Sequence, residues 1–431
     1  MTPPHEHLTV LALRFFGRGT CLCRIEHRDD HLLASGVLPG ERAHVRRLDI
    51  PGPARWHATD ILDPSRHRIA PGCPVAAQCA GCALLHLERV AEVDSKARTL
   101  QEILERHAGL RWPAENIERI ATDAREGLRH RTTWTLRRTP DGDVQPCFRT
   151  VDRDWVPTGH CAAVRGKLKV AIGEVARLCG MLNAEASSEV SLEEGRDGIG
   201  MIVRSGDPAW PGERDPFLVP RVVSAVAVQD GPRSPVTVRA GRWPAPSAIG
   251  EVHLPPAPGV WQHATPACAI GLHRWVLDVL ADGGASLLDA TCGAGGLLVA
   301  LASLFGRVVA VDRHHAAVLA ARRACLEQGL ENVDVRGGRI ETVAPRLVRD
   351  GARFHTVLVN PMRRSLGDSA MAQLAALTGR TLLYLAPAPR AGASDIAALM
   401  KAGLAPRRVA LVDLHPGTAA MMMGVRLDRA V

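Results

Sequence analysis

The feature that most constrains the fold is an apolar run that ends in an acidic residue and passes into a glycine-rich turn. Leu287-Leu288-Asp289 is followed by Gly293-Ala294-Gly295, and an apolar helical stretch begins at Leu297. Glycines let a backbone approach a ligand closely, and the first turn of a helix presents free N–H groups. The next apolar run, Val308–Val311, ends in Asp312, and an acid at such a strand end commonly holds ribose hydroxyls. The segment therefore predicts a βαβ unit that binds a nucleotide-like ligand.

The sequence after Pro255-Pro256 alternates between apolar runs and helical periods, which is typical of a parallel sheet covered by helices. Strands are predicted at residues 286–290, 308–312, 333–336, 356–359, 381–385 and 408–412. The glycine spacing lacks the third glycine of the dinucleotide fingerprint. A nicotinamide-binding unit and a tight turn that merely packs a helix on a sheet both remain open. The pattern resembles motifs I and II of the class I methyltransferases, which implies S-adenosylmethionine as cofactor and a Rossmann-like α/β domain over residues 251–431.

The first 250 residues have a different character. Short alternating strands broken by turns predict a small all-β barrel over residues 1–60. Residues 61–250 are expected to form a central α+β domain. A helix is predicted over residues 84–107, because apolar residues recur there at three and four positions, and we expect it to pack on the carboxyl-terminal domain. Strands are predicted between 125 and 165, whereas residues 171–250 show little clear period.

Four cysteines suggest a metal centre. Cys73, Cys79 and Cys82 form a C-x5-C-x2-C pattern in a segment rich in proline and glycine, and Cys161 is a distant fourth member. Clustered thiolates favour zinc or an iron–sulfur cluster, each of which takes four ligands. Spacing alone does not choose between the two metals. Ordinary buried thiols are the alternative.

The charge balance is compatible with a polyanionic partner. The chain has 53 basic and 45 acidic residues, a net charge of +8, and only four of the basic residues are lysines. Arginine suits phosphate, although a bias of the genome explains the arginine content equally well. The candidate RNA contacts are the arginines of one predicted strand region, Arg129, Arg131, Arg137 and Arg138, with a solvated basic strand as the alternative. Aromatic residues make up only 3% of the chain, which argues against a surface that stacks many bases.

The amino terminus has no basic-then-apolar leader, and the longest apolar stretch, residues 297–305, is too short to span a membrane. We therefore expect a soluble, cytoplasmic protein without a membrane partner, and a monomer by default.

The cysteine segment carries a resemblance to a known family. Cys73-Pro74 through Cys79-Ala80-Gly81-Cys82, followed by His86, resembles the C-P-x4-C-G-G-C-x3-H signature of the RNA uracil-C5 methyltransferases. Gly17-Arg18-Gly19 and Leu38–Glu41 resemble the family's TRAM module, an oligonucleotide-binding type of barrel. Residues 128–131, 147–149 and 260–262 resemble its Y-R-x-R, G-F-R and F-x-Q segments. The resemblance implies ribosomal or transfer RNA as substrate. It also implies a 4Fe–4S cluster, rather than zinc, on Cys73, Cys79, Cys82 and Cys161.

The resemblance also implies which residues contact the cofactor and which would act in catalysis. Cofactor contacts are expected at Gln262, Asp289, Gly293, Gly295, Asp312 and Asn360. The family reaction needs a cysteine thiolate that adds to uracil C6 and a glutamate that removes the C5 proton. Here the nucleophile position is Pro387 and the base position is Met422. Asn360 replaces the family's acidic uracil contact, and Ala264 replaces the asparagine of F-x-Q-x-N. Neither Cys292 nor Cys325 is positioned to substitute for the missing thiol.

Three hypotheses follow for the function. The first is a cytoplasmic RNA methyltransferase of the uracil-C5 family that is active in some form, although the residues at the nucleophile and base positions speak against C5 methylation. The second is a catalytically inactive relative that binds RNA. The third is methylation of an exocyclic nitrogen, in which Asn360-Pro361 would accept a hydrogen bond from the amine, although Arg363 stands where such enzymes have an aromatic residue.

Overall fold

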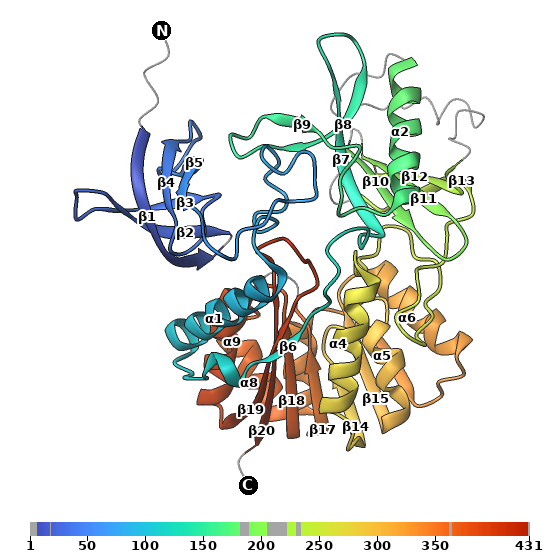
Figure 1. Cartoon of the computed structure of the whole chain (residues 1–431). Coiled ribbons are helices and arrows are strands. Elements are labelled where there is room, and N and C mark those ends of the chain that lie inside the picture. Colours follow the sequence, from blue (N-terminus) through green and yellow to red (C-terminus); the bar gives the residue numbers. More distant parts are fainter. Residues whose placement is uncertain are drawn as a thin grey trace.

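The computed structural model describes residues 7–17, 19–181, 189–204, 222–229, 234–361 and 364–429. Arg18 in the expected TRAM segment and Arg363 after Asn360-Pro361 lie outside the described residues. Figure 1 shows a small barrel, a central sheet and a larger carboxyl-terminal α/β unit.

The predicted amino-terminal barrel is confirmed. Its five strands close in the order β1-β2-β3-β5-β4. They are β1 (His7–Gly17), β2 (Thr20–Ile25), β3 (His31–Ser35), β4 (Arg42–Arg47) and β5 (Trp56–Asp63). Alternate residues point inward, as the period of a strand requires, so that Val10, Cys21, Cys23 and Val45 form the barrel core.

The long helix α1 (Arg89–Ala108) begins later than residue 84, where its periodicity starts. Residues 84–88 are held instead by tertiary hydrogen bonds. The Leu84 N–H donates to the Gly417 carbonyl at 2.9 Å, and the Ile69 N–H donates to the His86 carbonyl at 2.9 Å. The apolar face of α1 packs with the core of the carboxyl-terminal unit through Val93, Leu100 and Leu104.

The middle part of the chain forms a seven-stranded sheet, called the central sheet below, in the order β13-β12-β11-β10-β7-β8-β9. The strands are β7 (Arg131–Arg138), β8 (Val144–Arg149), β9 (Trp155–Pro157), β10 (Glu189–Glu194), β11 (Ile199–Arg204), β12 (Ala225–Val228) and β13 (Thr237–Gly241). Helix α2 (Gly166–Met181) packs on one face of this sheet.

The sequence between 171 and 250 has more regular structure than its weak period predicts. Strand β12 is buried at every residue, and β11 at all but the last. A strand that is buried on both faces has a continuous apolar run instead of an alternating one. The alternation that reveals a strand is therefore missing there.

The carboxyl-terminal unit contains an eight-stranded sheet in the order β16-β15-β14-β17-β18-β20-β19-β6. All six predicted strands are present, as β14 (Gly284–Asp289), β15 (Phe305–Asp312), β16 (Val333–Gly337), β17 (Phe354–Val359), β18 (Thr378–Ala386) and β19 (Leu404–Val412). Two strands were not predicted, β20 (Met422–Arg429) and the short β6 (Glu118–Ile120). Strand β20 lies antiparallel between β18 and β19, and β6 extends the sheet edge beside β19.

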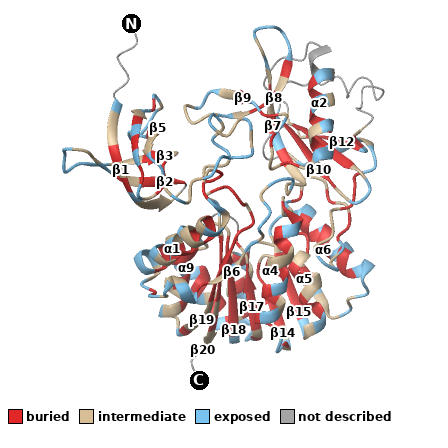
Figure 2. Cartoon of the chain, in the orientation of Figure 1, coloured by how far each residue is buried: buried red, intermediate tan, exposed pale blue. Residues whose placement is uncertain are grey.

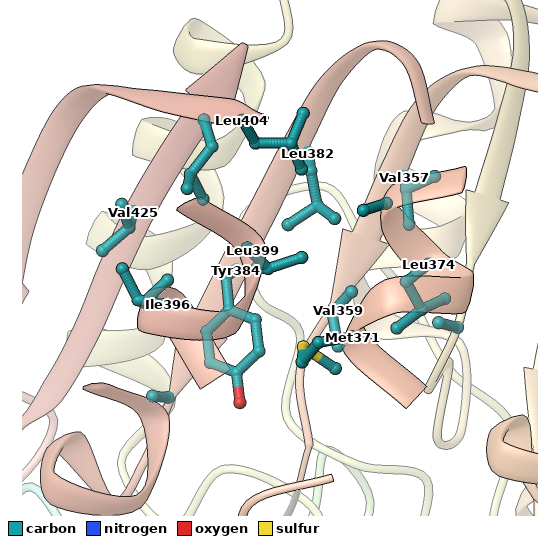
Figure 3. Close-up of a cluster of buried hydrophobic side chains, with 14 of the residues drawn as sticks. Val357, Val359, Met371, Leu374, Leu382, Tyr384, Ile396, Leu399, Leu404 and Val425 are labelled. Atoms are coloured by element: carbon teal, nitrogen blue, oxygen red, sulfur yellow. The ribbon is translucent and has the colours of Figure 1, made fainter. Parts of the chain in front are cut away.

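Helices cover both faces of this sheet, so that its strands are the most buried part of the unit (Figure 2). One face packs against α1, α7 (Ile340–Arg349), α8 (Asp368–Leu377) and α9 (Pro389–Lys401). The other packs against α4 (Pro266–Val279), α5 (Gly296–Leu301) and α6 (His315–Glu327). Figure 3 shows the first core, with Tyr384 of β18 among Ile396, Leu399 and Met371. No helix in the described part of the chain is long and apolar enough to cross a membrane.

Candidate cofactor and RNA sites

The glycine-rich loop lies at the carboxyl edge of the sheet, between β14 and α5. Gly293 and Gly295 have positive φ angles of 55° and 95°, a region that side chains with a Cβ atom rarely adopt. The Asp312 carboxylate closes the loop, because it accepts hydrogen bonds from the Gly293 N–H at 2.9 Å and the His314 N–H at 2.8 Å. The loop that the sequence predicts is thus folded around the acid of the next strand.

Asp289 and Asn360 fix the other side of the loop. The Asp289 carboxylate is buried and accepts a hydrogen bond from the Thr291 N–H at 3.2 Å. The pKa of Asp289 is raised to about 7, chiefly by burial and to a smaller extent by the negative charge of Asp312, while the Thr291 N–H opposes the shift. The Asn360 N–H donates to the Thr291 hydroxyl at 2.7 Å, which joins the end of β17 to the loop.

The structure therefore brings five of the six expected cofactor residues to neighbouring strand ends. Asp289, Asp312 and Asn360 end or follow β14, β15 and β17, and the two glycines lie between β14 and α5. Gln262, the sixth, lies in the segment before α4. The carboxyl edge of an open α/β sheet is where such folds bind their ligands.

Two histidines near the loop belong to no recognisable sequence motif. His273 of α4 is buried, and its Nδ1 has no hydrogen-bond partner among the described residues. A Cβ atom added at Gly296 would lie 3.8 Å from the His273 ring, so this histidine borders the start of α5. The His263 ring centre lies 6.4 Å from that of His273. Burial lowers the pKa of His263 to about 3 and that of His273 to about 4, so both rings are neutral at physiological pH. No local pattern connects these residues, which are brought together only by the fold.

Pro387 and Met422, where the resemblance places the family's catalytic residues, meet at the end of β18 and the start of β20. Ala386 is paired with Met423, so that Pro387 and Met422 continue the same register. Neither side chain can act as a nucleophile or a base, and Met422 is buried. Tyr384, which precedes the nucleophile position, is buried and donates a hydrogen bond from its hydroxyl to Asp395.

Two buried cysteines could be considered as replacements for the missing nucleophile. Cys292 lies in the glycine-rich loop, and burial raises the pKa of its thiol far above the usual range. Cys268, which no sequence motif singles out, lies in the first turn of α4. It is also buried, and burial raises its pKa. A thiol with a raised pKa carries little thiolate, so neither residue has the environment of an activated nucleophile.

A buried ionic network holds the loop before β20 against α1. The Glu92 carboxylate, fully buried, lies 2.8 Å from the Lys96 ammonium and 2.7 Å from the Arg125 guanidinium. It also accepts a hydrogen bond from the Gly417 N–H at 2.8 Å. Asp413, which follows β19, lies 2.9 Å from Lys96 and 2.6 Å from Arg89. The network thus connects α1 to both ends of the segment 413–417.

The four candidate metal ligands lie near one another. The thiol of Cys82 is close enough to those of Cys161, Cys79 and Cys73 for their charges to raise its pKa, although burial is the larger cause of the rise. The Gly81 N–H donates to the Cys79 sulfur at 3.4 Å. Within the described residues, however, no three cysteine, histidine or acidic side chains are arranged so that they could hold a metal ion.

The four predicted RNA-binding arginines have different surroundings. Arg131 forms an ion pair with Glu193 at 2.9 Å, so its charge is already compensated. Arg129 lies near the cysteines, where its charge lowers the pKa of the Cys82 thiol. Arg137 lies over the ring of Trp155, and the exposed Arg138 donates to the Gly142 carbonyl. The four arginines therefore do not form a single basic surface.

The carboxyl-terminal sheet with its loop, joined to a barrel and a second sheet, defines a class I methyltransferase fold with additional amino-terminal parts. The same arrangement occurs in the tRNA (uracil-54, C5)-methyltransferase of Pyrococcus abyssi, solved with S-adenosyl-L-homocysteine. The two structures match with a TM-score of 0.75 over 97% of this chain and 99% of that chain, at 18% identity.

Sequence relatives cover nearly the whole chain. Residues 261–430 match the family model for tRNA (uracil-5-)-methyltransferase. The chain is 25% identical to the 23S rRNA (uracil(1939)-C(5))-methyltransferase RlmD of Alkalilimnicola ehrlichii, over 96% of this chain and 94% of the relative. It is 26% identical to an uncharacterized RNA methyltransferase of Streptomyces coelicolor, over 93% and 88% of the two chains. The chain is thus similar over nearly its whole length to RNA uracil-C5 methyltransferases, and residues 261–430 match their family model.

Proposed function

We propose that this protein transfers a methyl group from S-adenosylmethionine to RNA. The observation that carries the proposal is the loop at the carboxyl edge of β14, where Gly293, Gly295 and Asp312 are arranged as a nucleoside site requires. The relatives named for ribosomal and transfer RNA support RNA as the substrate. In this site Asp312 would hold the ribose hydroxyls, and Gln262 and Asp289 would contact the rest of the cofactor.

The proposed reaction does not pass through a covalent uracil adduct. C5 of uracil becomes a good nucleophile only after a thiolate adds to C6, and a base must then remove the C5 proton. Pro387 and Met422 supply neither group. Each 1.36 kcal/mol added to the barrier slows a reaction about tenfold, so carbon methylation without these groups would be very slow.

An amine nitrogen of a base is therefore the proposed acceptor. Its lone pair attacks the methyl carbon, the carbon–sulfur bond breaks, and the sulfur leaves as neutral S-adenosylhomocysteine while the nitrogen loses its proton to water. The amide of Asn360, at the end of β17 and beside the loop, would accept a hydrogen bond from the amine.

Nucleoside mass spectrometry tests this function. Purified protein, labelled S-adenosylmethionine and bulk RNA from a strain that lacks the gene are expected to give a labelled N-methylated nucleoside. An Asn360→Ala variant is expected to reduce the product at least tenfold, because the amine loses its acceptor. Labelled 5-methyluridine would contradict the proposed mechanism.

A non-catalytic RNA-binding protein is the second candidate, and the apolar residues at both catalytic positions favour it. The same experiment separates the two, because this candidate binds RNA without labelling it. Calorimetry with S-adenosylmethionine then shows whether the loop still binds the cofactor.

The proposal includes a 4Fe–4S cluster on Cys73, Cys79, Cys82 and Cys161. The donor set suits it in kind, since the four thiols lie near enough to influence one another's charge and a backbone N–H donates to one sulfur, as is common around such clusters. The cluster would hold the segment 73–82 in place. The thiols must move closer for this, because they are not in ligand geometry within the described residues.

The metal prediction is tested on protein purified without oxygen. Cys79→Ser is expected to remove most of the bound iron and the visible absorbance of the cluster, because one of four ligands is lost. Cys147→Ser, in the buried thiol of β8, is the matched control and should keep both. Zinc instead of iron in the wild-type protein would contradict the cluster.

The division into residues 1–60, 61–250 and 251–431, and the assignment of the barrel as a TRAM module, remain part of this proposal. A monomer that binds ribosomal or transfer RNA is the expected form.

A further inference from the structure

Two arginines and a tryptophan from three neighbouring strands converge at one edge of the central sheet. The guanidinium of Arg149 lies 3.5 Å from the ring centre of Trp155, and that of Arg137 lies 5.2 Å from it. Arg149 of β8 is paired directly with Trp155 of β9. Arg137 of β7 is paired with Gln145, which lies on the same face of β8 as Arg149. This group is called the Arg–Trp–Arg stack below.

The two guanidinium groups are not neutralised. Among the described residues, neither Arg137 nor Arg149 has a carboxylate within ion-pair distance, whereas Arg131 on the same face is paired with Glu193. Arg149 uses one N–H on the Arg153 carbonyl at 2.6 Å. Stacking on an indole ring occupies the face of a guanidinium but leaves the N–H edge available, and that edge matches the oxygens of a phosphate.

Two other parts of the molecule hold the stack in place. The Ala80 N–H donates to the Arg149 carbonyl at 3.0 Å, and Cys79 forms a β-bridge with Thr150. In the turn between β8 and β9, Asp152 forms two hydrogen bonds with Arg46 of the barrel, at 2.9 and 2.6 Å. The cysteine segment and the barrel therefore fix the strand ends that carry Arg149 and Trp155. A site fixed before binding loses less entropy when its ligand arrives.

We propose that the Arg–Trp–Arg stack binds backbone phosphate of the RNA substrate. The proposal rests on the proposed function for the identity of the polyanion. Two arginines without a carboxylate partner complement a phosphate, and a single tryptophan within reach of both provides orientation instead of a surface for many bases. The stack adds Arg149 and Trp155 to the predicted contacts, and it selects Arg137 from the four arginines of the sequence analysis.

The test is the salt dependence of RNA binding, measured by filter binding with labelled bulk ribosomal RNA and the full-length protein. Arg137→Ala and Arg149→Ala are each expected to weaken binding about tenfold at low salt and to lower the slope of log K against log salt by about one. Trp155→Ala should weaken binding because the guanidinium groups lose their orientation, and Trp155→Phe should restore part of it. Arg111→Ala is the control, since it removes an exposed arginine from the loop after α1.

The outcomes separate this inference from the proposed function. If the wild-type protein does not bind RNA with a salt-dependent affinity, the proposed function fails together with the inference. If the wild-type protein binds and the Arg137 and Arg149 variants keep its affinity and slope, only the inference is overturned. Cofactor affinity, measured on each variant by calorimetry, should be unchanged and shows that the carboxyl-terminal unit is folded.

Discussion

Replacing Glu92 with alanine is expected to lower the free energy of unfolding by about 3–5 kcal/mol. Glu92 is fully buried and lies within 2.7–3.2 Å of Arg125, Lys96 and Arg89. Its removal leaves the buried Lys96 and the largely buried Arg89 and Arg125 with Asp413 as their remaining acidic partner in the network. The cost comes from charges that stay buried without compensation, and it exceeds what the ion pairs contribute when they are intact. The Gly417 N–H also loses its acceptor.

Urea denaturation of the purified protein, followed by tryptophan fluorescence, measures this effect. Glu105→Ala is the matched control on the same helix, because Glu105 forms an exposed ion pair with Arg111 at 3.4 Å. An exposed pair contributes about 0–1 kcal/mol, so the control should stay close to the wild-type protein. Equal midpoints for Glu92→Ala and the control would show that the network does not stabilise the fold.

Replacing Asp312 with alanine is expected to lower the affinity for S-adenosylmethionine at least about a hundredfold. Two hydrogen bonds from ribose hydroxyls to a carboxylate are together worth roughly 3 kcal/mol or more. The same side chain closes the loop through the N–H groups of Gly293 and His314, so its removal also disorders the site. Asp312→Asn keeps one acceptor oxygen and should fall between alanine and the wild-type protein.

Isothermal titration calorimetry with S-adenosylmethionine provides the measurement. Asp334→Ala, on the neighbouring strand β16, removes an exposed aspartate that pairs with Arg336 at 2.6 Å, and should leave the affinity unchanged. Wild-type affinity in the Asp312→Ala variant would remove this residue, and the proposed ribose contact, from the cofactor site.

The glycine-rich loop could be predicted because its signal is local. The residues from Leu287 to Asp312 form one βαβ unit, and the positive φ angles of Gly293 and Gly295 explain why glycine occurs there. The six strands of the carboxyl-terminal sheet were predicted for the same reason, since each is a short apolar run with a clear boundary. Strand β20 was not predicted, because it contains Arg426, Asp428 and Arg429 and follows a segment with no regular period.

The surroundings of the four predicted RNA-binding arginines could not be predicted from local sequence. Composition and strand position identify Arg129, Arg131, Arg137 and Arg138 as one group. The four arginines differ only in the group that each side chain contacts. Arg131 forms an ion pair with Glu193, which lies on a strand more than fifty residues later in the chain. Arg149 and Trp155 become candidates only through the register of β8 with β9.

The sequence by itself determined the class of the carboxyl-terminal fold, the glycine-rich loop and the barrel, and it places Pro387 and Met422 where the resemblance expects a cysteine and a glutamate. These properties depend on residue type and on spacing within one or two elements. The tertiary structure decided which charges are compensated, where the buried network of Glu92 and Asp413 lies, and which arginines remain available to an anion. Such properties depend on contacts between residues far apart in the chain, because charge and burial act through space and the spacing of the sequence does not record them.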